Sequence, residues 1–373
     1  MRRFVLSLAF LLGAASTAFS EGSPEVLKIG ATLALSGKFA FIGEAEQRGL
    51  MLGVEQANRE ADGKELLKLI FEDNAADAKT AVQGVRKLLS VDKVDVIFSA
   101  FTHVTHAIAP IVAAQGKIMI YEASLRSIAS MSPYFFRDYL DMERDAERLA
   151  NYAAGKGDKQ VVYLGDDGEV CDVHEKEFSK RATKLGIKLL AVEEFQSGTP
   201  DLKSLLLRSV KFKPDALVVC AWRDTHVLAK QLTELGVTTI PVYYVLAPFL
   251  PAADTAAMRE IFERQHAVST WFGFVESEKR PEYQAFRDAY MRRFGDEPRP
   301  DAAYAYDDML ALGRAAKVCS KNGAADRDCL VRELSSLQFV GAAGEFSFGP
   351  NRISARPSLL MQVQQGEWKI IEQ

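Results

Sequence analysis

Strand-length apolar runs alternate with amphipathic helical stretches from Glu25 to about Phe272. The strand candidates are Leu27–Leu35, Leu66–Phe71, Val94–Ala100, Lys117–Ala123, Gln160–Gly165, Ile187–Phe195, Asp215–Ala221, Pro241–Ala247 and Ala267–Phe272. Between them, stretches such as Glu44–Asn58 and Ala78–Leu89 place their apolar residues on one helical face. Nearly continuous apolar strands that alternate with helices are typical of parallel sheets covered by helices on both faces. The sequence therefore predicts an α/β fold.

The alternation pauses at Tyr134–Asp141 and then restarts, which indicates a first crossing between two lobes. We expect a second crossing near Trp271 and a third before the last strands, so that the hinge has three segments. The later elements are expected at Pro281–Phe294, Asp301–Cys319, Arg327–Leu337, Gly344–Phe348, Ser358–Gln364 and Glu367–Ile371. Residues 25–140 and 271–343 would form the N-terminal lobe, and residues 141–270 and 344–373 the C-terminal lobe. A ligand cleft is expected between the lobes.

The first 20 residues have the pattern of a secretory signal peptide. Arg2 and Arg3 precede the apolar run Phe4–Leu12, and Ala18-Phe19-Ser20 supplies small residues at a cleavage site. The alternative, a buried N-terminal helix, is less consistent with this order of segments. We therefore expect a periplasmic protein whose mature chain starts after Ser20. No cysteine follows the apolar run, so no lipid anchor is indicated there.

Composition narrows the classes of partner. The net charge of −4 becomes −6 once Arg2 and Arg3 are lost, and Lys and Arg are spread over the whole sequence. This argues against a nucleic-acid partner. No segment after residue 20 has the roughly 18 uninterrupted apolar residues of a transmembrane helix, so no direct membrane insertion is expected. We expect a monomer.

The four cysteines of an exported chain favour disulfides over redox chemistry. Cys319 and Cys329 flank a turn-rich stretch, so a local bridge is the preferred pairing. Cys171 and Cys220 would form the second bridge, since both are expected just beyond strand ends of one lobe. Four cysteines allow three connectivities, and the sequence does not choose among them.

Binding residues are expected in the turns that follow the strands, because ligands of open parallel sheets bind at the carboxyl ends of the strands. Thr102 is placed to cap a helix and to offer a hydroxyl to an anion, although a plain cap is the alternative. Trp222 and Arg223 follow another strand, where a Trp is typical of a pocket wall.

Signals for an enzyme are weak. The sequence has no Gly-x-Ser-x-Gly elbow and no phosphate-binding or dinucleotide-binding glycine motif. His103 and His106, with His226 as a third candidate, lack the spacing of a metal site, so no metal and no cofactor are expected. For Asp307 and Asp308, a solvated helix face or a packing contact is favoured over acid catalysis.

Taken in order, a set of short motifs resembles the type I periplasmic binding proteins of the leucine/isoleucine/valine branch, the receptors of ABC importers for hydrophobic amino acids. These motifs are Lys28-Ile29-Gly30, Leu35-Ser36-Gly37 with Gly43, Arg48-Gly49, Glu55-Gln56-Ala57-Asn58, Glu72-Asp73-Asn74-Ala75-Ala76-Asp77, Phe136-Arg137, Gly198-Thr199-Pro200-Asp201, Pro214-Asp215 and Ala305-Tyr306-Asp307. The resemblance covers nearly the whole mature chain. It implies two lobes that close on a ligand by a hinge motion, with the closed form recognised by permease subunits.

The resemblance also implies roles for single residues. Thr102 stands where a hydroxyl holds the ligand carboxylate, and the carbonyl of Ala123 stands where the ammonium is bound. Leu125 replaces a second hydroxyl residue, and no acid lies near Tyr244 to Leu246, where the family has an acidic partner for the ammonium. The expected ligand-binding residues are Ile42, Phe101, Thr102, Tyr121, Ala123, Ser124, Leu125, Val170, Trp222, Arg223 and Tyr244.

The expected lining is apolar and aromatic, and it lacks the second hydroxyl and the acidic partner of the ammonium. This favours a hydrophobic or aromatic solute, a carboxylate in particular, over a branched-chain amino acid. Arg223 offers that carboxylate a positive partner, with a solvated surface position as the alternative. The binding component of an importer is the leading hypothesis. Branched-chain amino acid binding, a sensing module for a membrane receptor and, last, an enzyme remain as alternatives.

Overall fold

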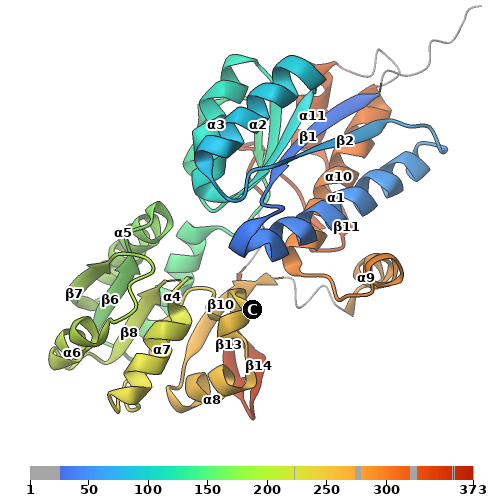
Figure 1. Cartoon of the computed structure of the whole chain (residues 1–373). Helices are drawn as coiled ribbons and strands as arrows, with labels where there is room; N and C mark the ends of the chain where they lie inside the picture. Colours follow the sequence, from blue (N-terminus) through green and yellow to red (C-terminus); the bar gives the residue numbers. More distant parts are fainter. Residues whose placement is uncertain are drawn as a thin grey trace, which may run out of the picture.

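Two open sheets and their helices form two lobes, one above the other (Figure 1). The computed structural model describes residues 26–221, 223–273, 279–319, 326–354, 356 and 358–372. The predicted signal peptide of residues 1–20 and the expected pocket residue Trp222 lie outside these ranges. Among the described helices, none has the length and apolar character needed to cross a membrane.

The first lobe contains a parallel sheet of five strands in the order β2-β1-β3-β4-β5. Its strands are β1 (Leu27–Leu33), β2 (Leu67–Asp73), β3 (Val96–Ala100), β4 (Ile118–Glu122) and β5 (Phe135–Arg137). The helices of this lobe are α1 (Ala40–Glu60), α2 (Ala78–Lys87), α3 (Thr102–Ala114), α9 (Pro281–Phe294), α10 (Pro300–Cys319) and α11 (Arg327–Ser336). Short helical turns η1 (Gly37–Phe39), η2 (Leu88–Asp92) and η3 (Arg126–Met131) join them.

Successive side chains of a strand point to opposite faces of the sheet, so they pack against different helix layers. In β3, Val96 and Phe98 pack in the cluster that includes residues of α1, α10 and α11, whereas Ile97 packs in the cluster of α2 and α3. Because both faces are covered, the strand reads as a continuous apolar run. The predicted sandwich of helices around a parallel sheet is confirmed.

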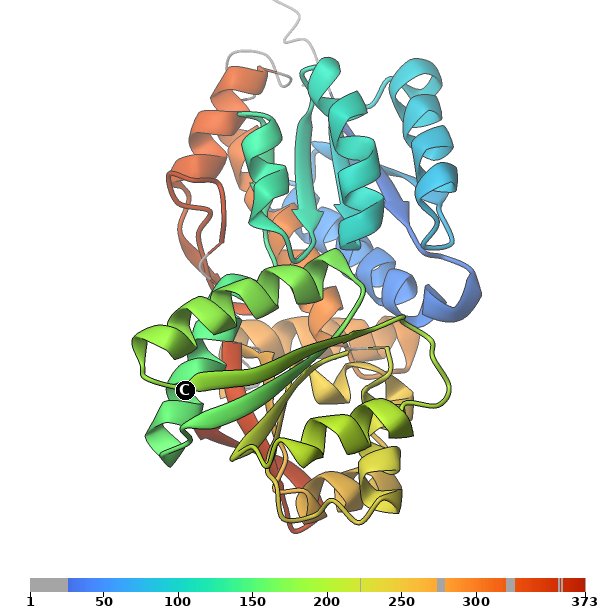
Figure 2. The ribbon, with the colours of Figure 1, turned by 90° about the vertical axis from the view of Figure 1, so that its left-hand side faces the viewer.

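The second lobe has seven strands in the order β14-β13-β10-β9-β8-β6-β7. They are β6 (Gln160–Asp166), β7 (Lys188–Phe195), β8 (Ala216–Cys220), β9 (Val242–Tyr244), β10 (Val268–Phe272), β13 (Ser358–Gln364) and β14 (Glu367–Glu372). Helices α4 (Met142–Lys156), α5 (Glu169–Lys184), α6 (Lys203–Lys211), α7 (Thr225–Glu234) and α8 (Ala256–Arg264) cover it, with turns η4 (Ala247–Phe249) and η5 (Pro251–Ala253) (Figure 2). The first five strands along the chain are parallel, but β13 and β14 are antiparallel, so this sheet is mixed.

Two of the crossings between the lobes run side by side. Residues 138–141 lead from β5 into α4, and the chain crosses again between the short hairpin β11 (Phe339–Gly341) and β12 (Gly344–Phe346) and strand β13. The backbone of Arg137, at the end of β5, pairs with two residues of the later crossing. Its amide donates to the carbonyl of Arg352 (2.9 Å), and its carbonyl accepts from the amide of Ser354 (2.8 Å). The guanidinium of Arg356 holds the carboxylate of Asp138 through two nitrogen atoms.

Two predicted boundaries need correction. Gly344–Phe348 does not open the second lobe, since β12 pairs with β11 and Phe348 packs on Phe136 of β5 at 5.0 Å between ring centroids. Tyr134–Asp141 is not wholly a linker either, because Phe135–Arg137 adds a buried fifth strand to the first sheet. Three residues of strand are too short to show a period in the sequence.

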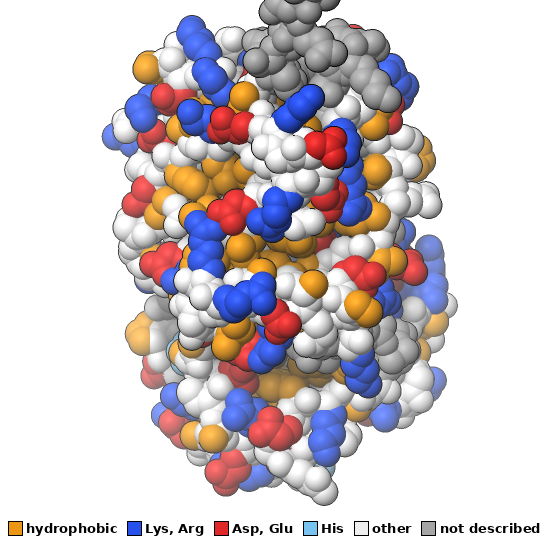
Figure 3. All heavy atoms as spheres, turned by 90° about the vertical axis from the view of Figure 1, so that its right-hand side faces the viewer, with side chains coloured by type: hydrophobic (Ala, Val, Ile, Leu, Met, Phe, Trp, Pro, Cys, Tyr) orange, Lys and Arg blue, Asp and Glu red, His pale blue; other side chains and the backbone are white. Residues whose placement is uncertain are grey.

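Both cysteine pairs expected from the sequence are bonded in the structure. Cys171–Cys220 joins the start of α5 to the end of β8, and Cys319–Cys329 joins α10 to α11. The surface is of mixed charge, and Figure 3 shows acidic and basic side chains interspersed with hydrophobic ones on one face.

Candidate ligand cleft

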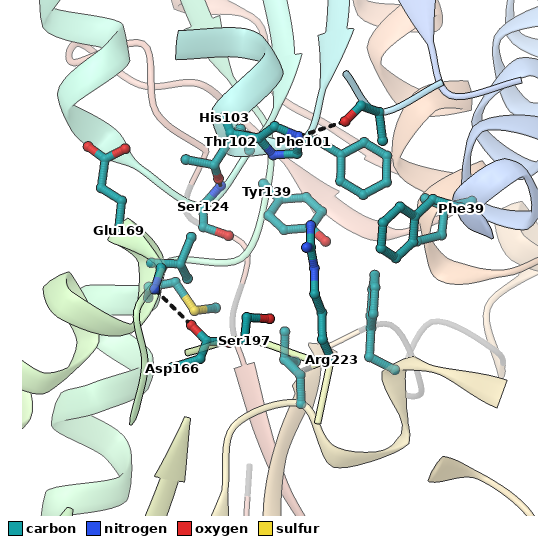
Figure 4. A pocket seen from close by; sticks show the side chains of 18 of the residues that line it. Phe39, Phe101, Thr102, His103, Ser124, Tyr139, Asp166, Glu169, Ser197 and Arg223 are labelled. Atoms are coloured by element: carbon teal, nitrogen blue, oxygen red, sulfur yellow. Dashed lines mark hydrogen bonds between the residues drawn. The ribbon is translucent and has the colours of Figure 1, made fainter. Parts of the chain in front are cut away.

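A cavity of about 490 Å³ lies between the lobes, where strand ends of both sheets meet (Figure 4). The first sheet has the strand order β2-β1-β3-β4-β5, and the parallel part of the second has the equivalent order β7-β6-β8-β9-β10. In sheets of this order, a crevice forms at the carboxyl ends of the strands, where the chain connections change direction. The lining comes from the turns that follow these strands. It comprises Lys38, Phe39, Ile42, Glu46, Ala75, Ala76, Phe101, Thr102, His103, Glu122, Ala123, Ser124, Tyr139, Met142, Asp166, Asp167, Gly168, Glu169, Val170, Ser197, Cys220, Arg223, Val245, Leu246 and Phe249.

Thr102 begins helix α3 on the first-lobe side of the cavity. Its hydroxyl oxygen accepts a hydrogen bond from the amide of Ser124 at 3.1 Å, so its hydroxyl proton can be donated to another acceptor. The first amides of a helix have no partner within the helix and carry a partial positive charge. The preceding residue, Phe101, has φ +64°, a backbone region that favours glycine. This strained turn brings both the Phe101 ring and the helix start to the cavity.

Arg223 supplies a cation from the second lobe. It follows the end of β8, and its guanidinium lies over the Phe39 ring of the first lobe, 5.0 Å from the ring centroid. Figure 4 shows its side chain reaching from the second lobe toward Phe39, Phe101 and Tyr139. A partly buried guanidinium in a cavity of this kind is suited to a carboxylate, which it can bind through two parallel hydrogen bonds.

Aromatic rings form much of the remaining wall. The ring centroids of Phe39 and Phe101 lie 5.7 Å apart. Phe249 of η4 stacks on Phe272 at the end of β10, with 6.1 Å between ring centroids. Tyr139 in the first crossing packs edge-on against the same Phe272 at 5.5 Å. Rings held by neighbouring rings form a rigid surface for an apolar or aromatic solute.

Carboxyl groups also reach the cavity. Asp166 ends β6, and burial raises its pKa to about 6, an effect opposed by the amide of Gly168 and reinforced by the charge of Asp224. Glu46 of α1 and Glu122 of β4 are each 2% exposed, and burial raises the pKa of both well above the usual range. The wall is therefore less apolar than the sequence indicated.

Comparison with known proteins agrees with this geometry. A family model described as periplasmic binding protein matches residues 26–367. The chain belongs to the periplasmic binding protein family. These are solute-binding proteins rather than enzymes. The Leu/Ile/Val-binding protein homolog 7 of Brucella melitensis is 23% identical over 97% of this chain and 94% of its own length, and homolog 8 of Brucella suis is 23% identical over 98% and 95%.

Solved structures show the same fold. The branched-chain amino acid transporter substrate-binding protein LivJ of Streptococcus pneumoniae, in complex with isoleucine, has a TM-score of 0.79 and 23% identity, and the match covers 94% of this chain and 100% of that one. A solute-binding protein of an ABC transporter from Rhodopseudomonas palustris, in complex with benzoate, has a TM-score of 0.78 and 19% identity over 93% and 96%. A third, from Rhodopseudomonas palustris BisB5 in complex with 3,4-dihydroxybenzoic acid, has a TM-score of 0.76 and 22% identity over 93% and 96%. The resemblance seen in the sequence is confirmed at the level of family and fold.

In this periplasmic binding protein, seven of the expected ligand-binding residues line the cavity. They are Ile42, Phe101, Thr102, Ala123, Ser124, Val170 and Arg223. Three others do not. Tyr121 and Leu125 are buried in the apolar layer of α2 and α3, and Tyr244 is buried beneath α7 and α8, where its hydroxyl donates to Gln265 at 2.9 Å. These three corrections have one cause, since neighbouring residues of a strand or turn point to opposite sides.

The carbonyl of Ala123, which the resemblance assigns to a ligand ammonium, already accepts a hydrogen bond from Nε of Arg137 at 2.7 Å. Arg137 is completely buried and also donates to the carbonyl of Ser124 at 3.0 Å. A second cation beside this guanidinium would be repelled. The Ala123 residue lines the cavity as expected, but the neighbouring Arg137 guanidinium makes its carbonyl unfavourable for an ammonium group.

Two histidines near the cavity make hydrogen bonds within the protein. Nε2 of His103 pairs with the carbonyl of Ala76 at 2.9 Å, and Nδ1 of His106 pairs with Glu169 of the second lobe at 3.3 Å.

Asp307 and Asp308 are both buried, so the prediction that they lie on a solvated helix face is wrong. Asp307 instead accepts hydrogen bonds from the amides of Ala342 and Ala343 and from Arg356.

Several lining residues were missed by sequence reasoning. Asp166 and Glu122 end strands that the sequence located, so the strand-end rule would have found them. Tyr139 lies in a crossing and Phe249 in a short turn, and neither place has a periodic pattern in the sequence. Glu46 lies within the helix predicted at Glu44–Asn58, where nothing local distinguishes it from a surface acid.

Proposed function

We propose that this protein is the periplasmic binding component of an ABC importer, and that its lobes close on a small carboxylate with a hydrophobic or aromatic body. The carrying observation is the composition of the cavity, in which a helix start and hydroxyl of one lobe face a guanidinium of the other. Export through the signal peptide of residues 1–20 is part of this proposal, and so is a monomer that presents its closed form to permease subunits.

The carboxylate of the solute would be held between Thr102 and Arg223. Thr102 donates its hydroxyl proton, the first amides of α3 add their partial positive charge, and Arg223 adds a full one. Because these groups belong to different lobes, the carboxylate is bound best when the lobes are closed. A solute with that preference shifts the population toward the closed form.

The body of the solute would lie against Phe39, Phe101, Tyr139 and Phe249. These rings, with Ile42 and Val170, offer a wall on which an aromatic ring stacks and from which water is displaced. Benzoate and 3,4-dihydroxybenzoic acid in two similar structures support this class of ligand. Isoleucine in a third supports an amino acid as the second candidate, and the acidic groups Glu46 and Glu122 in the wall favour it.

A thermal-shift screen of the mature protein tests the proposal. A solute that binds the native state alone raises the unfolding midpoint. Benzoate, hydroxybenzoates, 3-phenylpropanoate, leucine and isoleucine are compared with their neutral amides. We expect stabilisation by aromatic carboxylates and little by the amides.

The variant Arg223→Gln should lose roughly 10- to 100-fold in affinity for the best carboxylate, the value of a hydrogen bond to a charged group. Arg264→Gln at the end of α8 serves as the matched control, since Arg264 is absent from the lining and pairs with Glu260 on its own helix. Equal affinity in Arg223→Gln and wild type would contradict the proposal.

A genomic neighbour that encodes a membrane kinase in place of permeases would favour a sensor over an importer.

A further inference from the structure

Three buried carboxyl groups from three separate elements meet at the first-lobe wall of the cavity. They belong to Glu46 of α1, Glu122 at the end of β4 and Asp301 in the first turn of α10. One oxygen of each lies within 4.8 Å of an oxygen of the other two. All three side chains are at most 2% exposed. Elements distant in the sequence thus direct three acids to one point.

Most of these oxygens have no partner among the described residues. Both carboxylate oxygens of Glu122 lack a hydrogen bond, as do Oε2 of Glu46 and Oδ1 of Asp301. One cation compensates part of the charge, since Nε of Arg299 donates to Oδ2 of Asp301 at 3.3 Å. The guanidinium of Arg299 also lies over the ring of Phe249, 5.6 Å from its centroid, so it is shared with the cavity wall.

Three buried carboxyl groups this close together are energetically unfavourable. Burial and the charges of the neighbouring acids raise the pKa of Glu122, and Glu46, Asp308, Asp301 and Asp138 all contribute in that direction. Buried acids without partners are expensive, and proteins retain them mainly where they serve a ligand. Protonation of one acid relieves part of the charge and supplies only one O–H donor to the three carboxyl groups.

The cluster borders the ligand cavity, which is the second and independent observation. Glu46 and Glu122 both belong to its lining, next to the rings of Tyr139 and Phe249. Aromatic faces and carboxylate oxygens both attract positive charge. The carbonyl of Ala123, in contrast, faces the Arg137 guanidinium and is a poor place for a cation.

We propose that Glu46, Glu122 and Asp301 form a subsite for a cationic group, the protonated amino group of the solute. The proposal rests on the function proposed above and specifies the ligand further, as a compound with a carboxylate at one end and an amino group at the other. Glu122 ends β4 and Ser124 follows two residues later, so their Cα atoms are at most about 7 Å apart. Since the amide of Ser124 is bonded to Thr102, the two subsites are close enough for a solute of amino-acid size.

Matched pairs of probes test the subsite. Phenylalanine is compared with 3-phenylpropanoate, and 4-(aminomethyl)benzoate with 4-methylbenzoate, by isothermal titration calorimetry on the mature protein. The two members of each pair differ only in the charged amino group, which one has and the other lacks. We expect the amino member of at least one pair to bind 10-fold tighter or more to wild type. In Glu122→Gln, which keeps the shape and removes the charge, that preference should disappear.

Glu44→Gln is the control, because Glu44 is exposed on the same helix as Glu46 and should leave the preference unchanged. Glu122→Gln without solute should melt at or above the wild-type temperature, since a buried acid has been replaced by a neutral amide. If that variant does not fold, Glu46→Gln provides the same comparison from another element.

The outcomes separate the two proposals. Equal binding within both pairs, with amine-free members still bound through Arg223, would overturn the subsite and leave the proposed function standing. Binding of no carboxylate at all would overturn the proposed function and the subsite with it. Calcium, magnesium and manganese chlorides form a third arm, and stabilisation by a metal alone that Glu122→Gln abolishes would overturn the assignment to an amino group.

Discussion

Asp166 is the single residue whose ionisation bears most directly on the carboxylate end of the cavity. It lies beside Arg223 in the lining, and Asp167 and Asp224 also act on it. Burial raises its pKa from 3.8 to about 6. Its folded form therefore holds a proton that the unfolded chain has already lost at pH 5.

This shift predicts how stability depends on pH. Because the folded pKa lies above the unfolded one, the contribution of Asp166 is greatest below about pH 4 and is lost as the pH rises through 6. Asp166→Asn should thus raise the free energy of unfolding at pH 8 by roughly 2–3 kcal/mol and change it little at pH 4. Urea unfolding at both pH values measures the difference.

The exposed Asp62→Asn supplies the control for that experiment and should give no such contrast. A gain for Asp166→Asn that is the same at pH 4 and pH 8 would mean that ionisation of Asp166 is not its cause. A loss at pH 8 would mean that the ionised carboxylate is stabilising.

At the scale of elements, the contact between α1 and α10 fixes the first-lobe wall. Both Glu46 and Asp301 depend on it, since they belong to these two helices. The helices approach closely at Gly49, where an added Cβ would lie 2.1 Å from the backbone oxygen of Ala302. Only glycine allows this approach, because a helical backbone cannot move aside as a side chain can.

Gly49→Ala should therefore destabilise the protein by roughly 1–3 kcal/mol or more, as overpacking does. The matched control is Gly155→Ala in α4, where the added Cβ meets nothing within 4 Å. That change should stabilise by about 0.5–1 kcal/mol through helix propensity. Thermal and urea unfolding of both variants measure the contrast, and equal effects of the two substitutions would contradict the proposed close contact.

The elements also show what the sequence can predict. Strand β3 and the start of α3 were located from Val94–Ala100 and Thr102, because a buried parallel strand and a helix cap have local signatures. The acids at Glu46 and Asp301 were not found, because their meeting depends on how α1 crosses α10. Tyr121 and Leu125 were expected in the lining but lie outside it, since neighbouring residues of a strand or turn point to opposite sides.

At the scale of the whole molecule, the disulfide Cys171–Cys220 ties α5 to β8 next to the cavity, and Val170 and Arg223 lie close to its two ends in sequence. It closes a loop with a sequence separation of 49 residues. The double variant Cys171→Ala/Cys220→Ala should lose roughly 3–4 kcal/mol of stability and bind its solute more weakly.

Cys319→Ala/Cys329→Ala serves as the comparison, because its shorter loop has a separation of 10 residues and lies away from the cavity. It should lose less stability, roughly 2–3 kcal/mol, and leave affinity unchanged. Urea unfolding and calorimetric titration of both double variants give the two quantities. The expectation fails if the two variants lose affinity equally.

In the proposed function, both lobes hold one carboxylate solute and close on it. Small-angle X-ray scattering of the mature protein, with and without a saturating solute from the thermal-shift screen, tests it most directly. We expect the radius of gyration to fall on addition of solute to wild type, and Arg223→Gln at the same solute concentration to show a smaller fall or none. An unchanged radius for wild type at saturation, or an equal fall in Arg223→Gln, would contradict it.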